Sequence, residues 1–170
     1  MQIKKPETFE ELLNLQRILD ETIDKPRENK FKPRHRNIYD MEMSIIAEVI
    51  EFNEENLKEE AIDILFFFLQ LINRKVSDNR DFNLSFFQWE WKHLFEDNSI
   101  IVYSDEAEMR IIKNISCNDI YRAFVNLIYL YIAYGISQNE VYSIYYEKWQ
   151  KNMERINKDW TLKGEQNGNV

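Results

Sequence analysis

The sequence predicts an all-α fold, a bundle of helices, on two observations. Only three glycines and three prolines occur in 170 residues, and the prolines all lie near the start, so almost nothing interrupts helices over residues 34–134. Apolar residues also recur at helical spacing. The first helix is expected to begin at Thr8, which forms a capping-box pattern with Glu11. A β-rich fold would need more turn glycines than this chain has.

The remaining helices follow from the same periodicity. A second helix is expected over about residues 37–53 and a third over about 57–76, which is apolar on nearly all sides and should be central. Because their connection is short, the two should pack antiparallel. A further helix is expected over residues 118–134, ended by Gly135, and a last one from about 138 to 158, capped by Ser137.

The domain organisation is expected to be simple. Residues 1–160 should form a single all-α catalytic domain, with residues 77–117 as an inserted, aromatic-rich segment. That segment mixes aromatic residues with polar breaks and is predicted to hold one short helix and irregular structure. The last residues, 161–170, are expected to be a flexible tail.

Composition argues against several classes of protein. The formal net charge of −8 is unlike that of a general nucleic-acid-binding protein. No apolar run approaches the roughly 20 residues that cross a bilayer, and the N-terminus lacks a hydrophobic signal core, so a cytoplasmic location without membrane contact is expected. The glycines are not clustered as a phosphate-binding loop requires. The single cysteine rules out internal disulfides and a thiolate metal cage.

Acidic side chains lie inside the most apolar part of the chain. Glu48 and Glu51 share one face of the second predicted helix, and Glu60 and Asp63 share one face of the third. Asp63 is surrounded by apolar residues, where an ionised carboxylate costs several kcal/mol unless it is paired or metal-bound. If the helices pack antiparallel, the four carboxylates converge, and such an all-oxygen set suits Mg²⁺ or Mn²⁺. A solvated face is the alternative for each pair, and Glu59 is the alternative to Glu60.

Polar residues on the last and first helices are candidate substrate contacts. Three polar residues lie along one line of the last helix: Lys148, Asn152 and Arg155. They either bind a phosphate chain or form a solvated polar face. On the first helix, Gln16 lies in an apolar stripe and Asp20 follows one turn later. A buried glutamine amide must be hydrogen-bonded, so Gln16 either ties helices together or contacts a nucleobase.

Together these motifs resemble the all-α nucleoside triphosphate pyrophosphohydrolases, and most closely the dimeric dUTPases of phages, bacteria and kinetoplastids. Residues 15–20 (LQRILD) look like the first motif of that family, and residues 46–51 (IAEVIE) look like the second. Residues 60–67 (EAIDILFF) are similar to its E-x-x-D helix, and residues 148–155 match its K-x3-N-x2-R pattern. The connection between the two acidic helices is shorter than in many relatives.

The resemblance implies Mg²⁺-dependent hydrolysis of dUTP to dUMP and pyrophosphate by a homodimer. The implied metal ligands are Glu48, Glu51, Glu60 and Asp63. One of the two glutamates on the second helix, Glu48 or Glu51, would also activate the attacking water. The implied substrate contacts are Gln16, Asp20, Phe67, Lys148, Asn152 and Arg155. Of these, Phe67 would pack against the deoxyribose and crowd out a 2′-hydroxyl.

Two alternatives remain at this point. One is a broader MazG-like pyrophosphohydrolase, which would accept ribonucleotides equally. The other is a helical interaction protein of phage type that binds a regulator, such as a repressor, through residues 77–117. The aromatic residues of that segment are then either core and dimer packing or the surface for the partner. They are Phe86, Phe87, Trp89, Trp91 and Phe95.

Overall fold

The computed structural model describes residues 4–24, 37–55, 57–96 and 104–157, and within these residues every regular element is a helix. The helices are α1 (Phe9–Ile23), α2 (Ile38–Glu55), α3 (Lys58–Asp78), α4 (Leu84–His93), α5 (Ser104–Ser116), α6 (Ile120–Ala133) and α7 (Gln138–Asn157), with a short 3-10 helix, η1 (Leu94–Glu96). The all-α prediction is therefore confirmed. The frayed tail expected at residues 161–170 lies outside the described residues.

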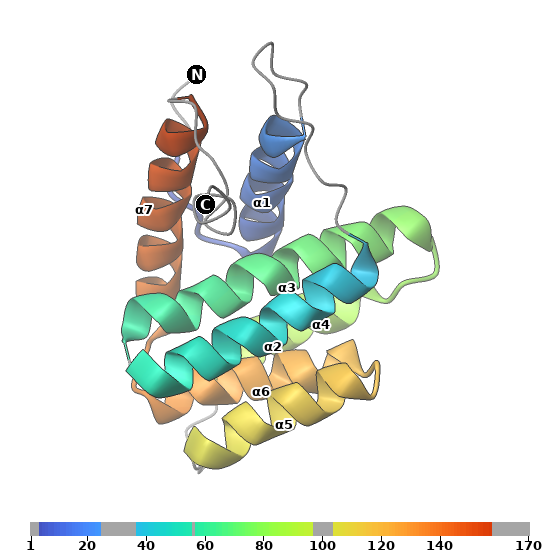
Figure 1. Cartoon of the computed structure of the whole chain (residues 1–170), viewed down its shortest axis with the longest axis vertical. Helices are drawn as coiled ribbons and strands as arrows, with labels where there is room; N and C mark the ends of the chain where they lie inside the picture. Colours follow the sequence, from blue (N-terminus) through green and yellow to red (C-terminus); the bar gives the residue numbers. More distant parts are fainter. Residues whose placement is uncertain (1–3, 25–36, 56, 97–103, 158–170) are drawn as a thin grey trace, which may run out of the picture.

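The helices form two groups that meet at α3. Helices α1 and α7 stand side by side and cross α3, while α2 lies along α3 and α5 and α6 lie next to each other at the far end of the molecule (Figure 1). The connection between α2 and α3 is short, as predicted, and the two helices are neighbours. Helix α7 meets α3 at Asp63, whereas α1 meets it further along, at Gln70 and Asn73.

The ends of several helices are set by local hydrogen bonds. Thr8 caps α1: its hydroxyl accepts from the backbone N–H of Glu11 at 3.2 Å, and the Glu11 carboxylate accepts from the Thr8 N–H at 3.1 Å. Ser137 and Glu140 make the same reciprocal pair at the start of α7. Helix α6 ends just before Gly135, whose φ of +64° lies in the left-handed region. The predicted caps and the glycine stop are confirmed.

Helix α3 is the centre of the core, as its apolar composition predicts. Its buried residues are Ala61, Ile62, Ile64, Leu65, Phe66, Phe68, Leu69, Leu71 and Ile72. Phe66 stacks on Tyr145 of α7 with ring centroids 4.2 Å apart, and Phe68 packs edge-on against Phe124 of α6. Because the helix is covered on nearly every side, any polar side chain on it needs a partner.

The prediction of a single short helix in residues 77–117 is wrong, because α4 and α5 both form there. The apolar residues that helix α5 buries form one line, Ala107, Ile111 and Ile115, and charged residues and Met109 are exposed around it. The stripe has helical spacing, but polar residues dominate the segment around it. Glu108 is also buried on α5, where its carboxylate accepts from Asn53 of α2 and from the Tyr134 hydroxyl, which follows α6.

Most of the aromatic residues of this segment belong to the core. Phe87 and Trp91 are buried, and the Trp91 indole N–H donates to the Tyr142 hydroxyl at 2.8 Å. Phe86 and Phe95 are half-buried against the same core. Trp89 differs, since 57% of it is exposed.

No single helix in the described ranges is long and apolar enough to cross a membrane. One bent pair, α6 with Gln138–Ile156 of α7, passes that test together by length and composition, with a bend of 103° between its halves.

Candidate active site

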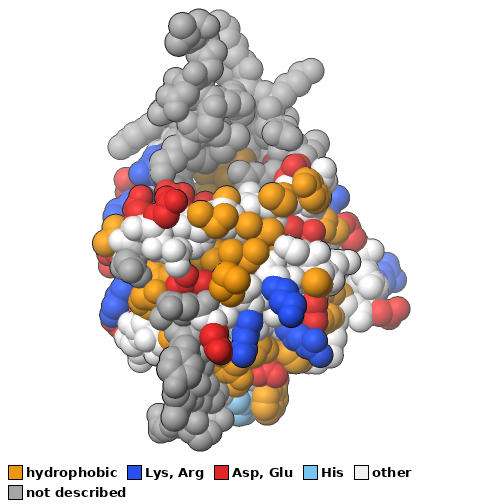
Figure 2. Space-filling model, turned by 60° about the horizontal axis from the view of Figure 1, so that its bottom comes forward, with side chains coloured by type: hydrophobic (Ala, Val, Ile, Leu, Met, Phe, Trp, Pro, Cys, Tyr) orange, Lys and Arg blue, Asp and Glu red, His pale blue; other side chains and the backbone are white. Residues whose placement is uncertain are grey.

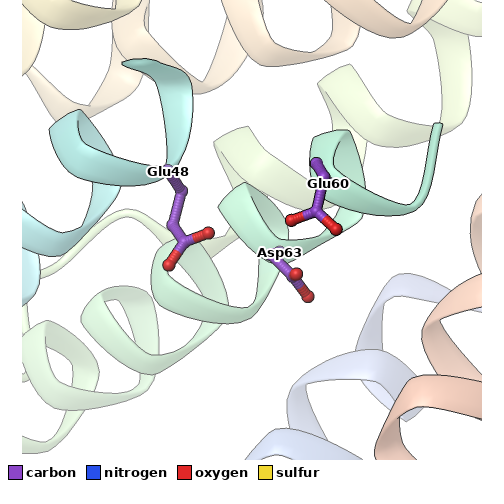
Figure 3. Close-up of side chains that lie close together, drawn as sticks. All are labelled: Glu48, Glu60 and Asp63. Carbon is purple, nitrogen blue, oxygen red and sulfur yellow. The ribbon is translucent and has the colours of Figure 1, made fainter. Parts of the chain in front are cut away.

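Three of the four predicted acids meet between α2 and α3. Glu48, Glu60 and Asp63 each offer a carboxylate oxygen, and these oxygens all lie within 4.8 Å of one another. Figure 3 shows the three side chains extending into the same space, Glu48 from α2 and the other two from successive turns of α3. All three residues are half-buried. The antiparallel pairing of the two helices produces this convergence.

The geometry of these oxygens fits a small divalent cation. In an octahedral Mg²⁺ site, with bonds of about 2.1 Å, two oxygens on opposite sides of the ion are about 4.2 Å apart. The 4.8 Å limit of the three oxygens is close to that span, so small side-chain rotations bring them to bonding distance. Carboxylate oxygens are also the donors that Mg²⁺ and Mn²⁺ prefer.

The electrostatics of the group show why it needs a positive charge. Burial, followed by the nearby charges of Asp63 and Glu51, raises the pKa of Glu48 from its ordinary 4.5 to about 7. Burial likewise raises the pKa of Asp63, while Lys148 acts to lower it. Carboxylates that repel each other in a partly dehydrated space are strained as anions, and a divalent cation would relieve that strain.

Lys148 already supplies one positive charge to this group. Its ammonium nitrogen Nζ lies 2.5 Å from Asp63 Oδ2 and 4.0 Å from Glu60 Oε1. The prediction assigned Lys148 to substrate phosphates, and nothing in the sequence pattern indicates that it lies beside Asp63. Helix α7 crosses α3 at this point, which brings the two side chains together.

Differences in exposure show which of the neighbouring acids face the site. Glu59 is exposed, whereas Glu60 is half-buried and belongs to the group of three, so Glu60 is the acid that faces α2. Glu51 is half-buried one turn beyond Glu48 and lies outside the group of three, although its charge contributes to the raised pKa of Glu48.

A single accessible stripe runs along α3 from these acids. Glu60, Asp63, Phe67 and Gln70 are half-buried, while the α3 residues between them are buried. Their spacing keeps them on one side of the helix, with Phe67 one turn after Asp63 and Gln70 nearly a turn later. This stripe places an aromatic ring and then an amide in line with the acidic group.

The far end of the stripe is a hydrogen-bonded network of polar side chains. Asp20 Oδ1 accepts from Gln16 Nε2 at 2.8 Å and from Gln70 Nε2 at 2.9 Å. The buried hydroxyl of Tyr145, on α7, donates to Gln16 Oε1 at 2.9 Å. Gln16 is 3% exposed, and its hydrogen bond with Tyr145 ties α1 to α7. Tying helices together was one of its two predicted roles.

The sequence interpretation did not single out Gln70 or Tyr145. The available signal was the lone amide of Gln70 within a run of isoleucine, leucine and phenylalanine, seven residues after Asp63. The two other predicted contacts, Asn152 and Arg155, lie one and two turns beyond Lys148 on α7, half-buried and exposed respectively.

An all-α bundle with a carboxylate group between two adjacent helices is an arrangement suited to a metal-assisted hydrolase. The sequence model of the dUTPase family matches residues 8–160, and the chain therefore belongs to the dUTPase family. It is accordingly an enzyme of the nucleoside triphosphate pyrophosphohydrolase class. Searches of curated proteins and of solved structures gave no match.

Proposed function

We propose that this protein hydrolyses dUTP to dUMP and pyrophosphate with Mg²⁺ as its cofactor and that Mn²⁺ can replace it. The observation that carries the proposal is the convergence of Glu48, Glu60 and Asp63 at one end of the accessible stripe of α3. The dUTPase family membership supports dUTP as the substrate.

In this proposal the acids divide into two roles. Glu48, Glu60 and Asp63 hold the ion, and Glu51 adds a ligand or takes a proton from the attacking water. When bound there, Mg²⁺ would offset charge on the triphosphate and make water a better nucleophile. Water attacks phosphorus, the α–β phosphoanhydride bond breaks, and pyrophosphate leaves.

The other predicted residues position the nucleotide. Lys148 lies beside the acids, so its ammonium group can move from Asp63 to a phosphate when a cation takes over the carboxylates. Asn152 and Arg155 continue that line of α7 toward sugar and phosphates. Phe67 packs against the deoxyribose. Gln16 and Asp20 then lie at the base end of the substrate.

The test is a pyrophosphate-release assay with Mg²⁺ and each of dUTP, dCTP, dTTP and UTP. The wild type is expected to prefer dUTP, and Asp63→Asn is expected to lose at least about a hundredfold in kcat/KM, because a carboxylate that holds the ion is lost. The matched control is Asp78→Asn on the same helix, whose exposed ion pair with Arg74 is worth little.

Each outcome of this assay has a distinct meaning. Failure to release pyrophosphate from any nucleotide would refute the enzymatic proposal. Equal turnover of dUTP and UTP would favour the broader MazG-like alternative instead. Full activity in Asp63→Asn would leave the acidic group without a catalytic role.

We further propose a homodimer, supported by an unpaired apolar face. Tyr39, Met43 and Ile50 lie on one side of α2 and are 67%, 44% and 49% exposed. Figure 2, turned so that the α5 and α6 end comes forward, shows hydrophobic side chains gathered across the middle of the visible surface. Burial of such a surface between two copies would stabilise a dimer. A cytoplasmic, phage-encoded protein is part of the same proposal.

A second candidate function, binding of a regulator such as a repressor, is favoured by Trp89. This tryptophan stacks on His93 with ring centroids 4.5 Å apart and stays largely exposed on α4. If the function exists, Asp63→Asn should keep partner binding while Trp89→Ala loses it, as measured by calorimetry with a purified repressor.

A further inference from the structure

We infer that Gln70 reads the nucleobase, with its side-chain oxygen accepting the N3–H of uracil. This inference rests on the proposed function and concerns a residue outside the motifs of the family resemblance. It starts from an unsatisfied atom: within the described residues, Gln70 Oε1 is a buried side-chain oxygen with no hydrogen-bond partner.

An unpartnered buried acceptor is costly, and so its presence calls for an explanation. A buried oxygen that has lost water without gaining a donor weakens the fold, and most buried polar atoms in proteins are therefore paired. The Gln70 residue itself is half-buried, on the accessible stripe of α3. A small turn of its side chain thus brings the oxygen to a ligand that lies along this stripe, and the ligand supplies the missing donor.

The hydrogen bond to Asp20 decides which end of the Gln70 amide is the free acceptor. Its Nε2 donates to Asp20 Oδ1 at 2.9 Å, and a flipped amide would set two acceptor oxygens against each other. Asp20 is held by Gln16, and Gln16 is held by the hydroxyl of Tyr145. Side chains from α7, α1 and α3 therefore keep Oε1 as the group offered to a ligand.

The position of Gln70 along α3 matches the base end of a nucleotide. Seven residues separate it from Asp63, which is about 10.5 Å along the axis and about 20° around the helix. Phe67 lies between them on the same stripe. A nucleotide with its phosphates at the acids and its deoxyribose on Phe67 therefore places its base at Gln70.

The chemistry of the base edge determines what this oxygen selects. Uracil carries a hydrogen on N3 and donates there, whereas cytosine has an acceptor at the same position. A fixed acceptor in a water-poor site rejects a ligand that presents a second acceptor. Thymine also donates from N3, so Gln70 separates uracil from cytosine and leaves the distinction from thymine to other groups.

The test compares binding of α,β-imido-dUTP and α,β-imido-dCTP by calorimetry in Mg²⁺. The wild type is expected to bind the uracil compound more tightly. In Gln70→Met this preference should fall about tenfold, because the hydrogen bond to uracil and the repulsion between two acceptors with cytosine are both lost. Gln88→Met is the matched control, since Gln88 also donates its amide to a carboxylate of α1, Glu10, at 2.8 Å.

Other results would overturn the inference or separate it from the proposed function. An unchanged preference in Gln70→Met, or no preference in the wild type, would overturn it. Gln70→Asn, which keeps an amide but withdraws its oxygen, should lose the same preference, and melting curves of both variants that match the wild type exclude a folding defect. Because the imido compounds cannot be cleaved, failure of pyrophosphate release alone would refute the hydrolytic proposal and leave this binding ratio as a separate result.

Discussion

At the scale of single residues, Lys148 and Asp63 form the closest charged pair of the site. Their 2.5 Å contact offsets an otherwise repulsive acidic group in the absence of a divalent ion. A cation that binds the same carboxylates must compete with this ammonium group. Lys148 therefore affects the metal-free fold and metal affinity in opposite directions.

The variant Lys148→Gln tests this competition. Its melting temperature in EDTA should fall by a few degrees, because half-buried carboxylates lose their nearest cation. Its affinity for Mn²⁺ should rise by about tenfold, since removing a positive charge at about 4 Å favours a cation. Calorimetry and thermal melts measure the two effects, with exposed Lys151→Gln on the same helix as control. Weaker Mn²⁺ binding in Lys148→Gln would contradict the competition.

The raised pKa of Glu48 predicts the pH dependence of the metal-free protein. The pKa of Glu48 is about 7 in the folded protein, against its ordinary 4.5. Between these two pH values, Glu48 therefore keeps its proton in the folded protein and has lost it in the unfolded chain. Stability should therefore decrease as pH rises from about 4.5 to about 7. In EDTA, melts of Glu48→Gln should show a smaller decrease than the wild type, and exposed Glu59→Gln should follow the wild type. Parallel curves for Glu48→Gln and wild type would contradict the assignment.

At the scale of elements, Gly135 controls the turn from α6 into α7. Its φ of +64° is left-handed, and no atom lies within 4 Å of the position that a Cβ would take there, so only backbone strain opposes a larger residue. Gly135→Ala should cost about 1 kcal/mol, which lowers the melting temperature by about 2–4 °C. Gly135→Asn should cost less, because asparagine tolerates this conformation. Equal melting temperatures for all three proteins would show that the turn relaxes freely.

The sequence predicted helices best where caps and periodicity agreed. Thr8 with Glu11, Ser137 and Gly135 each marked a helix end that the structure has. Helix α5 was missed because polar residues dominate its segment, and its buried Glu108 is charged where an apolar residue would be expected. Glu108 is buried only because Asn53 and Tyr134, distant in sequence, come to meet it.

At the scale of the whole molecule, the relative placement of α1, α7 and α3 decides what the site contains. The pairing of α2 with α3 was readable from a short connection, and with it the meeting of Glu48 with Asp63. The crossing of α3 by α7 and α1 leaves no periodic signal. For that reason the contact between Lys148 and Asp63, and the link from Asp20 to Gln70, could be seen only in three dimensions.

The exposed face of α2 gives a prediction about assembly. Light scattering should give twice the 20.8 kDa mass of one chain, and Met43→Asp should shift the protein toward the monomer, because a charge would be buried against an apolar surface. Trp89→Asp, at an exposed position on α4, serves as the control. A monomeric wild type would contradict the proposed dimer.

The most direct test of the site is a crystal structure with Mn²⁺, read by its anomalous scattering. We expect at least one ion bonded to oxygens of Glu48, Glu60 and Asp63, with the Lys148 ammonium group displaced from Asp63. A structure at saturating Mn²⁺ in which no ion lies among these carboxylates, and Lys148 still contacts Asp63, would contradict the account.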